Sequence, residues 1–296
     1  MITTSLFFPG IITRTKSILS GRKGPAILQP LKDIWRLFRK GTVYSETSSF
    51  IFRLAPSIYF ATVIMASVTV PFGNLPGILS FRGDFVFFAY TLAVGKFFMI
   101  IAAMDTGSSF EGMGASREAL YSMLADPAFF ILMGSFALLT GNNSFVEIFT
   151  HLHFGSYISY ALGALATFVL VLLTMVENSR MPIDDPKTHL ELTMIHEVMV
   201  LDNSGFDLGL ILHAANLKFA LYGALIANFL IPPEMPLHYS IPIFIGIQLC
   251  FSIGIGIIES FTARFRMSHN AQFIFTLTSI SLLIFLGVLL MLGRIT

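Results

Sequence analysis

The sequence predicts an all-α protein: a polytopic bundle of about seven to eight transmembrane helices with one amphipathic helix at the membrane interface. Three observations lead to this fold class. The chain of 296 residues is 55% hydrophobic and only 12% charged, about half the charged fraction of roughly 25% in soluble domains. Its apolar stretches are long enough to cross a bilayer. Its basic residues gather on one set of loops.

Seven stretches contain the roughly 20 mostly apolar residues that a helix needs to cross the hydrocarbon core. They are residues 50–72, 84–104, 118–140, 157–178, 208–231, 240–260 and 270–292. The segments between them are rich in Gly, Pro, Asn and Asp, which favour loops. Residues 1–20 hold an apolar patch interrupted by Pro9 and Gly10, so only a partial first helix is expected there. We therefore expect residues 1–296 to form a single membrane domain.

Residues 27–40 are predicted to form the interfacial helix. Apolar residues recur there at spacings of three and four, and charged residues occupy the remaining face. The apolar residues are Leu28, Leu31, Trp35 and Phe38. A helix of this pattern lies in the interface rather than crossing the membrane; the alternative is a cytosolic helix that packs on a partner protein.

The positions of Lys and Arg predict the orientation. If residues 14–49 are cytoplasmic, fourteen of the eighteen basic residues lie on the cytoplasmic side, as the positive-inside rule requires. These are Arg14, Lys16, Arg22, Lys23, Lys32, Arg36, Arg39, Lys40, Arg53, Arg117, Arg180, Lys187, Arg264 and Arg266. We therefore expect a multi-pass protein of the cell membrane (inner or plasma) with basic loops in the cytoplasm.

No metal, redox or catalytic centre is predicted within this chain. Its one cysteine, Cys250, can form neither a disulfide framework nor a Cys-ligated iron–sulfur cluster. The seven histidines lie in loops or near the ends of the predicted spans, which disfavours haem ligation inside a bundle. His196-Glu197 lacks the second histidine of a zinc-protease motif, since the residue four positions after His196 is Val200.

Six ionisable residues fall inside predicted spans or at their ends. They are Lys96, Glu118, Asp126, Glu177, Lys218 and Glu259. A charge at the bilayer centre costs at least about 2.5–3.5 kcal/mol, so such a residue indicates a function. Glu118 and Asp126, eight positions apart, share one helix face. Together with Lys96, Lys218 and Glu259 they are expected to converge on one hydrated cavity and pass protons; the alternative is static ion pairs that fix helix register.

Two loops provide further evidence about function. Residues 105–117 are rich in Gly and Ser, and residues 177–205 alternate acidic with apolar side chains. Within the second loop, residues 188–202 are predicted to form an amphipathic helix against the membrane. This alternation favours a half-buried surface that meets a partner subunit over a merely solvated one.

Four segments resemble a known family. They are GRKGPAILQPLKDIWRLFRKG (21–41), MDTGSSFEGMGASREAL (104–120), ENSRMPIDDPKTHLELTMIHEVMVLDNSG (177–205) and IESFTARFRM (258–267). They are similar to subunit 1 (the H subunit) of respiratory complex I and, more closely, to its relatives in membrane-bound [NiFe] hydrogenases and formate hydrogenlyase. The GASRE form of the second segment resembles the hydrogenase branch. The resemblance runs from about residue 10 to the C-terminus.

The resemblance implies a non-catalytic membrane anchor for a soluble redox arm. Its partners would be a [NiFe]-hydrogenase-like large subunit, a small iron–sulfur subunit, a ferredoxin-like subunit and antiporter-like membrane subunits, with no nucleic acid. The [NiFe] centre and the iron–sulfur clusters would lie in those partners. The expected proton path comprises Lys96, Glu118, Asp126, Glu177, Asp184, Glu191, Lys218 and Glu259, and all of these except Lys96 and Asp126 match motif positions of the family. The expected subunit-docking residues are Arg22, Gly24, Pro25, Asp105, Gly107, Arg117, Arg180, Pro182, Asp185, Asp202, Arg264 and Arg266, and all of these except Asp185, Asp202 and Arg266 match motif positions of the family.

The chain departs from the family pattern in three places. The first helix is a stub, and Asp126-Pro127 stands where the family often has Glu-Pro. In the acidic loop only Glu191 remains of three spaced glutamates, because Lys187 and His189 occupy the other two positions. The last of these departures weakens the expectation that the loop conducts protons and that the chain binds a quinone.

The leading hypothesis is a proton-path subunit of a hydrogenase-type complex, in which a redox change in the arm alters the proton affinity of Glu191, Glu118 and Asp126. The first alternative is the quinone-binding H subunit of an NADH-quinone oxidoreductase, with the quinone entering beside helix 27–40. The second is a stand-alone secondary transporter, which the absence of a mirrored second half disfavours.

Overall fold

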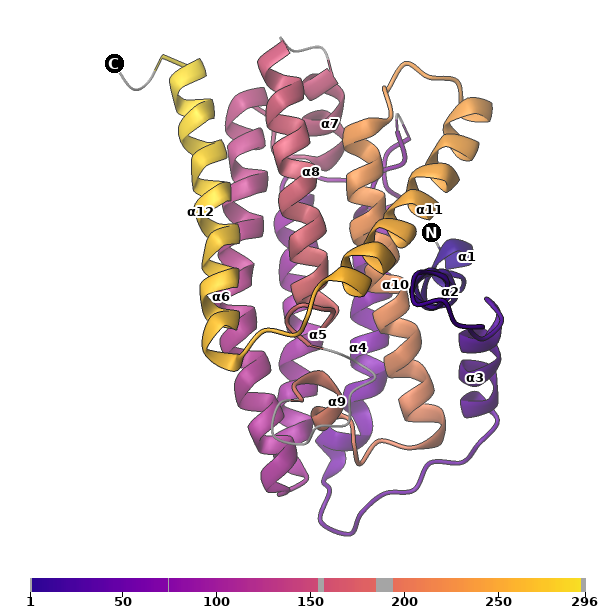
Figure 1. The fold of residues 1–296 in the computed structure, drawn as a ribbon. Helices are drawn as coiled ribbons and strands as arrows, with labels where there is room; N and C mark the ends of the chain where they lie inside the picture. The colour runs from indigo at the N-terminus through magenta and orange to yellow at the C-terminus, as the bar shows by residue number, and fades with distance from the viewer. Residues whose placement is uncertain (1, 74, 154–156, 185–193, 294–296) are drawn as a thin grey trace.

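The structure, a computed structural model, describes residues 2–73, 75–153, 157–184 and 194–293. Within these ranges every element is a helix, which confirms the predicted all-α class. The helices are α1 Ile2–Ser5, α2 Phe8–Leu19, α3 Gln29–Phe38, α4 Phe50–Thr69, α5 Asp84–Asp105, α6 Ser109–Thr140, α7 Phe145–His153, α8 Tyr157–Glu177, α9 His196–Met199, α10 Gly205–Leu230, α11 Leu237–Phe261 and α12 Met267–Met291. Figure 1 shows the long helices side by side in one bundle.

Seven helices of the described residues are long and apolar enough to cross a membrane, so the chain is a multi-pass membrane protein. They are α4, α5, α6, α8, α10, α11 and α12. Except at the start of α6, their ends lie within three residues of the predicted boundaries. The long apolar runs account for this agreement, because a helix is the structure that satisfies backbone groups in lipid.

The start of α6 differs from the prediction. The helix begins at Ser109, nine residues before the expected start at 118, so most of the predicted loop 105–117 is helical. The glycines of this segment suggested a loop, yet one of them has a packing role. A Cβ on Gly114 would lie 2.8 Å from the carbonyl oxygen of Ile195. Glycine at position 114 lets α6 approach the backbone at Ile195 closely. This tertiary contact outweighs the low helix propensity of the glycine residues.

The N-terminal segment is more regular than predicted. Pro9 and Gly10 do not interrupt the helix: Pro9 lies in the first turn of α2, where the missing N–H would have no partner anyway. The α2 helix packs on α11, and Thr15 lies so close that a Cβ on Gly256 would meet it at 2.9 Å.

Three other elements depart from the expectations. The buried face of α3 is centred on Ile34, while Trp35 is 64% exposed and available to the interface. The predicted helix 188–202 is helical in its described part only over His196–Met199. Residues 188–193 lie outside the described residues. Helix α7 was not predicted, because its nine residues are too few to cross a membrane.

The α10 helix lies at the centre of the bundle. Within its apolar window 78% of the residues are buried, the highest share among the seven spans. It contacts α3, α4, α8 and α11, while α5 packs on α4 and α6, and α12 packs on α6 and α8. Side chains that point inward from α5, α6, α8 and α10 therefore meet in the interior.

Candidate functional site

Five ionisable residues from four helices meet in the bundle, and we call them the buried charge cluster: Lys96 of α5, Glu118 and Asp126 of α6, Glu177 of α8 and Lys218 of α10. All except Asp126, whose side chain reaches the outer face of α6, are buried. Glu177 lies between the two lysines. Its Oε1 is 2.5 Å from Lys96 Nζ and its Oε2 is 3.5 Å from Lys218 Nζ. Lys96 Nζ also lies 3.7 Å from Asp126 Oδ1.

Helical spacing positions these side chains. Glu118, Ser122 and Asp126 follow one another at intervals of four, so they share one face of α6. The Ser122 hydroxyl accepts a hydrogen bond from Lys96 Nζ at 3.2 Å. On α10, Tyr222 lies one turn beyond Lys218. Both helices thus carry polar side chains one turn apart on the side that borders the cluster.

A small cavity of about 60 Å³ lies against the cluster. Lys96, Asp126, Glu177 and Tyr222 provide its polar lining, and aromatic and aliphatic side chains provide the rest. A water needs only about 10–15 Å³ of such space and two to four polar partners. The cavity therefore has the size and the polar groups to hold water between Lys96, Asp126 and Glu177.

The cluster combines three carboxylates with two lysines in a largely apolar setting. Lys96, Glu177 and Lys218 have side chains at most 8% exposed, and Glu118 is 9% exposed. Isolated charges would be strongly disfavoured here, so each must be neutralised by a neighbour or by a proton. Among the described residues no basic side chain lies within ion-pair distance of Glu118, although Lys96 and Lys218 are close enough to act on it electrostatically.

Glu259 does not lie with this cluster, contrary to the prediction of one shared cavity. Its Oε2 is 3.0 Å from Lys16 Nζ and its Oε1 is 3.5 Å from Arg180 Nη1. The reason is architectural: α11, which carries Glu259, packs on α2 and α10 rather than on α5 or α6. These three residues form a second group, and two of them, Lys16 and Glu259, line an open groove of about 380 Å³ between α2 and α11.

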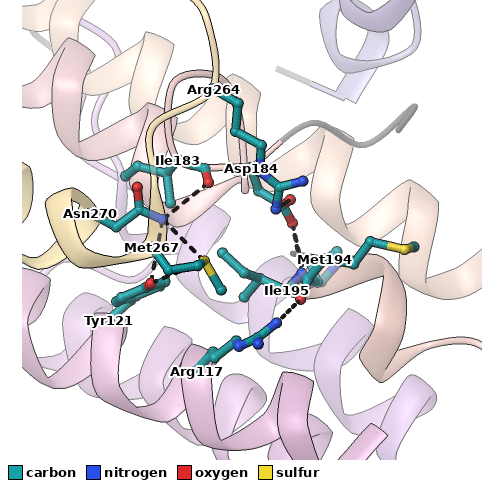
Figure 2. Close-up of polar contacts among 10 residues, drawn as sticks. Arg117, Tyr121, Ile183, Asp184, Met194, Ile195, Arg264, Met267 and Asn270 are labelled. Atoms are coloured by element: carbon teal, nitrogen blue, oxygen red, sulfur yellow. Dashed lines mark hydrogen bonds and ion pairs between the residues drawn. The ribbon is translucent and has the colours of Figure 1, made fainter. Parts of the chain in front are cut away.

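A third set of contacts ties the loop after α8 to the start of α12. Asp184 Oδ1 accepts a hydrogen bond from Arg264 Nη2 at 2.7 Å. Asp184 Oδ2 accepts from the backbone N–H groups of Ile195 and His196 at 3.2 and 3.1 Å. Figure 2 shows Asp184 between Arg264 and the backbone of Ile195. One carboxylate thereby joins two segments that are eleven residues apart in sequence.

The same region is attached to α6 and α12. Arg117 Nη1 donates to the Met194 carbonyl at 2.9 Å, and Asn270 Nδ2 donates to the Ile183 carbonyl and to the Tyr121 hydroxyl at 3.3 Å each. Figure 2 shows these contacts around the same loop. We call the contacts of Asp184, Arg264, Arg117 and Asn270 the loop network.

Two groups in the loop network have altered proton affinities. Burial raises the pKa of Asp184, and this effect outweighs the lowering by the Arg264 guanidinium and by the backbone donors. Burial, together with the positive charge of Lys218, lowers the pKa of His196 to about 4, while Asp184 opposes this shift. His196 is therefore neutral at physiological pH.

The residues predicted to dock partner subunits are mostly engaged within the chain. Asp105 accepts from the backbone N–H of Ser49 at 2.7 Å. The backbone N–H of Asp202 donates to Glu111 at 2.9 Å, and the Pro182 carbonyl accepts from the N–H of Phe265 at 2.9 Å. Arg22 lines the groove beside Lys16.

The remaining predicted docking residues make only local contacts or lie outside the described residues. The Gly24 carbonyl accepts from Arg14 at 3.2 Å, and Pro25 directly follows in the segment that leads to α3. Gly107 has a φ of 72°, which glycine adopts readily. Arg266 immediately precedes α12. Asp185 and Glu191 lie outside the described residues.

Sequence reasoning missed three polar residues that contact these groups: Ser122, Tyr222 and Lys16. For two of them a signal was present, because Ser122 lies midway between Glu118 and Asp126 and Tyr222 lies four residues after Lys218. Lys16 gave none, since its partner Glu259 is 243 residues away. Within the described residues no group of three or more His, Cys, Asp or Glu side chains could hold a metal ion.

Several known proteins are similar to this chain. It is 28% identical over 225 residues to hydrogenase-4 component C of Escherichia coli (strain K12), which covers 76% of this chain and 70% of the relative. It is 27% identical over 209 residues to formate hydrogenlyase subunit 4 of the same organism, covering 71% and 67%. The H subunit of NADH-quinone oxidoreductase from Flavobacterium johnsoniae is 24% identical over 189 residues, covering 58% and 53%.

The fold is also found in a solved structure. A chain of the membrane-bound sulfane sulfur reductase, an archaeal respiratory membrane complex, superposes with a TM-score of 0.80 at 18% identity, covering 96% of this chain and 94% of that one. Finally, residues 1–290 match the family model described as NADH dehydrogenase. The resemblance inferred from four sequence segments is thereby confirmed: this chain belongs to the family of NADH dehydrogenase subunit 1, also called the H subunit.

Proposed function

We propose that this chain is the non-catalytic membrane subunit of a respiratory-type redox complex of the membrane-bound [NiFe] hydrogenase or formate hydrogenlyase type, and that the buried charge cluster carries protons for it. The observation that supports this best is the placement of Glu177 between two buried lysines, with Asp126 beside Lys96. The names of the two relatives from Escherichia coli favour the hydrogenase type.

The cluster has the chemistry that a proton path needs. Glu177 contacts both lysines, and Lys96 contacts two carboxylates, so a proton gained by Asp126 leaves both lysines paired with Glu177. Low-dielectric surroundings make the energy of each group depend strongly on its neighbours' charges. A change of charge at the loop network would therefore alter the proton occupancy of the cluster. The two are linked by the electrostatic interaction between His196 and Lys218.

The proposal includes partners and a location. The soluble arm would comprise a [NiFe]-hydrogenase-like large subunit, a small iron–sulfur subunit and a ferredoxin-like subunit, which hold the metal centres. Antiporter-like subunits would adjoin the chain in the cell (inner or plasma) membrane. Its basic loops would face the cytoplasm, following the positive-inside rule.

The test uses the whole complex in proteoliposomes. Electron transfer and proton uptake are measured in parallel for Glu118→Gln, Asp126→Asn and Lys218→Met. We expect assembly and electron transfer to be retained while proton transport falls at least about tenfold, because each substitution removes a titrating group and leaves Lys96 paired with Glu177.

The matched control is Asp33→Asn. Asp33 forms an exposed pair with Arg36 at 3.5 Å on α3, where an ion pair contributes little, so proton transport should be unchanged. Wild-type proton transport in all three cluster variants would contradict the proposal. Transport by the purified chain alone would instead favour the secondary-transporter alternative.

A quinone-binding role is the second candidate, and one observation favours it. An apolar groove of about 420 Å³ lies between α2 and α11 and includes Ile27, at the approach to α3. Quinone extraction from the purified complex tests this role. A stoichiometric quinone, or inhibition of electron transfer by quinone-site ligands, would place the chain with the quinone-reducing relatives.

A further inference from the structure

The outer face of α6 carries an acidic side chain where a lipid-facing helix would be apolar. The Asp126 side chain is 41% exposed, whereas its partner Lys96 is only 8% exposed. Leu120 and Met123, on the same exposed stripe, are 47% and 65% exposed. Asp126 therefore closes the inner cluster on one side and presents a carboxylate to the outside of the bundle on the other.

The neighbouring backbone is polar as well. The α6 helix continues through Pro127, which has no N–H to donate. The Met123 carbonyl, four residues earlier, therefore lacks its usual intrahelical partner. A freed carbonyl and an exposed carboxylate thus lie within one turn of each other. Both are hydrogen-bond acceptors, and neither supplies a donor.

Both acceptors lie at the depth of the hydrocarbon. Thr140, the last residue of α6, is 14 positions beyond Asp126 (140 − 126), or about 21 Å at 1.5 Å per residue. A hydrocarbon core of about 30 Å that ends near Thr140 would then extend about 9 Å past Asp126 in the other direction. In lipid, an unsatisfied backbone carbonyl and a charged side chain are both strongly disfavoured.

From these observations we infer that the α5–α6 face around Asp126 is the docking surface for a transmembrane helix of a different subunit, which presents hydrogen-bond donors to Asp126 and to the Met123 carbonyl. Donors of suitable chemistry are Ser, Thr, Asn, Lys or Arg side chains. Exposed aromatic residues of α5, Tyr90 at 62% and Phe97 at 58%, provide apolar surface for packing on the same side.

Other occupants fit less well. An acyl chain has no donor, and a lipid headgroup lies too far from this depth. A second copy of this chain related by a two-fold axis would bring equivalent surfaces together. Asp126 would then face Asp126, and acceptors would oppose acceptors. The inference rests on the chain being one subunit of a larger complex, but not on proton movement through the cluster.

The first experiment replaces Met123 by the photo-crosslinking residue p-benzoylphenylalanine in the complete complex, within its native membrane. Irradiation followed by mass spectrometry identifies what the probe reaches. We expect an adduct with a transmembrane segment of another subunit that contains a donor side chain within one turn of the adduct. Adducts with lipid alone, with a second copy of this chain, or with a segment that has no donor would overturn the inference.

The second experiment compares three variants by the amount of each membrane subunit that co-purifies with this chain. Asp126→Leu removes the acceptor and should reduce recovery of the crosslinked subunit about tenfold or more, because the partner's donor is left unsatisfied. Asp126→Asn keeps an acceptor oxygen and should retain the subunit. Met123→Leu, a control on the same face, should also retain it. Equal recovery with Asp126→Leu and Asp126→Asn would contradict the role of Asp126 in docking, and it is distinguishable from a failure of proton transport.

Discussion

The two ends of the bundle accommodate buried polar groups in different ways. At the end that carries the loop network, charged side chains contact one another across helices. Toward the other end, aromatic rings fill the interior: Phe88 packs on Phe129 and Phe145 at 5.7 Å each, and Phe229 packs on Phe149 at 4.9 Å between ring centroids. Phe88 and Phe129 also line the cavity beside the charge cluster, so the aromatic packing begins where the charges stop.

The few polar groups at the aromatic end have fixed backbone partners. Asp84 accepts from the backbone N–H of Phe145 at 2.7 Å and from the Ser144 hydroxyl at 2.9 Å. Asn228 binds the N–H of Gly73 and the carbonyl of Pro71. In the charge cluster the partners are themselves titratable. The comparison teaches that burial alone does not make a polar group a proton carrier; it also needs neighbours that can change their protonation.

Removing the central carboxylate should give the largest effect. Glu177→Leu would leave Lys96 and Lys218 without their shared partner, and breaking a buried ion pair in this way costs about 3–5 kcal/mol. We expect little assembled complex and a lower thermal unfolding temperature in detergent. Near-normal unfolding would show that the cluster is hydrated and not a dry ion-pair network.

A substitution in the aromatic end tests its role as a seal. Phe88→Ala deletes a ring that is 1% exposed and should destabilise the protein by roughly 3 kcal/mol. We also expect a faster passive proton leak in proteoliposomes, because the cavity would extend past the aromatic layer. Ile284→Ala, which removes a fully buried side chain on α12, is the control for a packing loss without a leak. An unchanged leak with Phe88→Ala would contradict the seal.

His196 should make the loop network sensitive to acid. Its pKa is about 4 in the folded protein against 6.5 for the ordinary side chain, so the unfolded state binds a proton first as the pH falls. The contribution of neutral His196 to folding stability is therefore fully present above about pH 6.5. It is lost between that pH and about 4, by roughly 1–2 kcal/mol, because the residue is only half-buried. Thermal unfolding at pH 7.5 and pH 5 measures the loss. His196→Gln should reduce the difference between the two temperatures, and an identical difference in both proteins would rule this origin out.

The smallest effect is expected from a local contact at the aromatic end. Asp84→Ala leaves the Phe145 N–H at the start of α7 without its acceptor, which costs about 1–2 kcal/mol, as for other capping residues. Hydrogen exchange should accelerate at the first turn of α7 and stay unchanged at α9. Faster exchange throughout the bundle would show that Asp84 supports the global fold instead.

The fold was largely predictable because hydrophobic length is a strong signal. Each span needs about 20 apolar residues, and little else in a sequence resembles that pattern. The start of α6 was missed because Gly114 looks like a loop residue until its contact with Ile195 is known. Helix α7 was missed because a short amphipathic helix between spans has no length signal.

The candidate site was predictable in part. Lys96, Glu118, Asp126 and Lys218 stood out because charges are rare in apolar runs, and spacing placed Glu118 and Asp126 on one face. Spacing cannot show which helices are neighbours. Glu259 is separate from the cluster because α11 packs on α2 and α10. No local pattern in a single sequence shows which helices pack together.

The length of α6 has a mechanical consequence. Its 32 residues extend about 48 Å, and adjacent positions on it serve different groups: Arg117 grips the Met194 carbonyl while Glu118 lies in the interior. The helix thus connects the loop network to the buried charge cluster. A turn of about 20° would move a side-chain tip about 6 Å from the axis by about 2 Å, enough to separate Asp126 from Lys96, now 3.7 Å apart. A rotation of α6 driven from the loop network would therefore break the Lys96–Asp126 contact in the membrane interior.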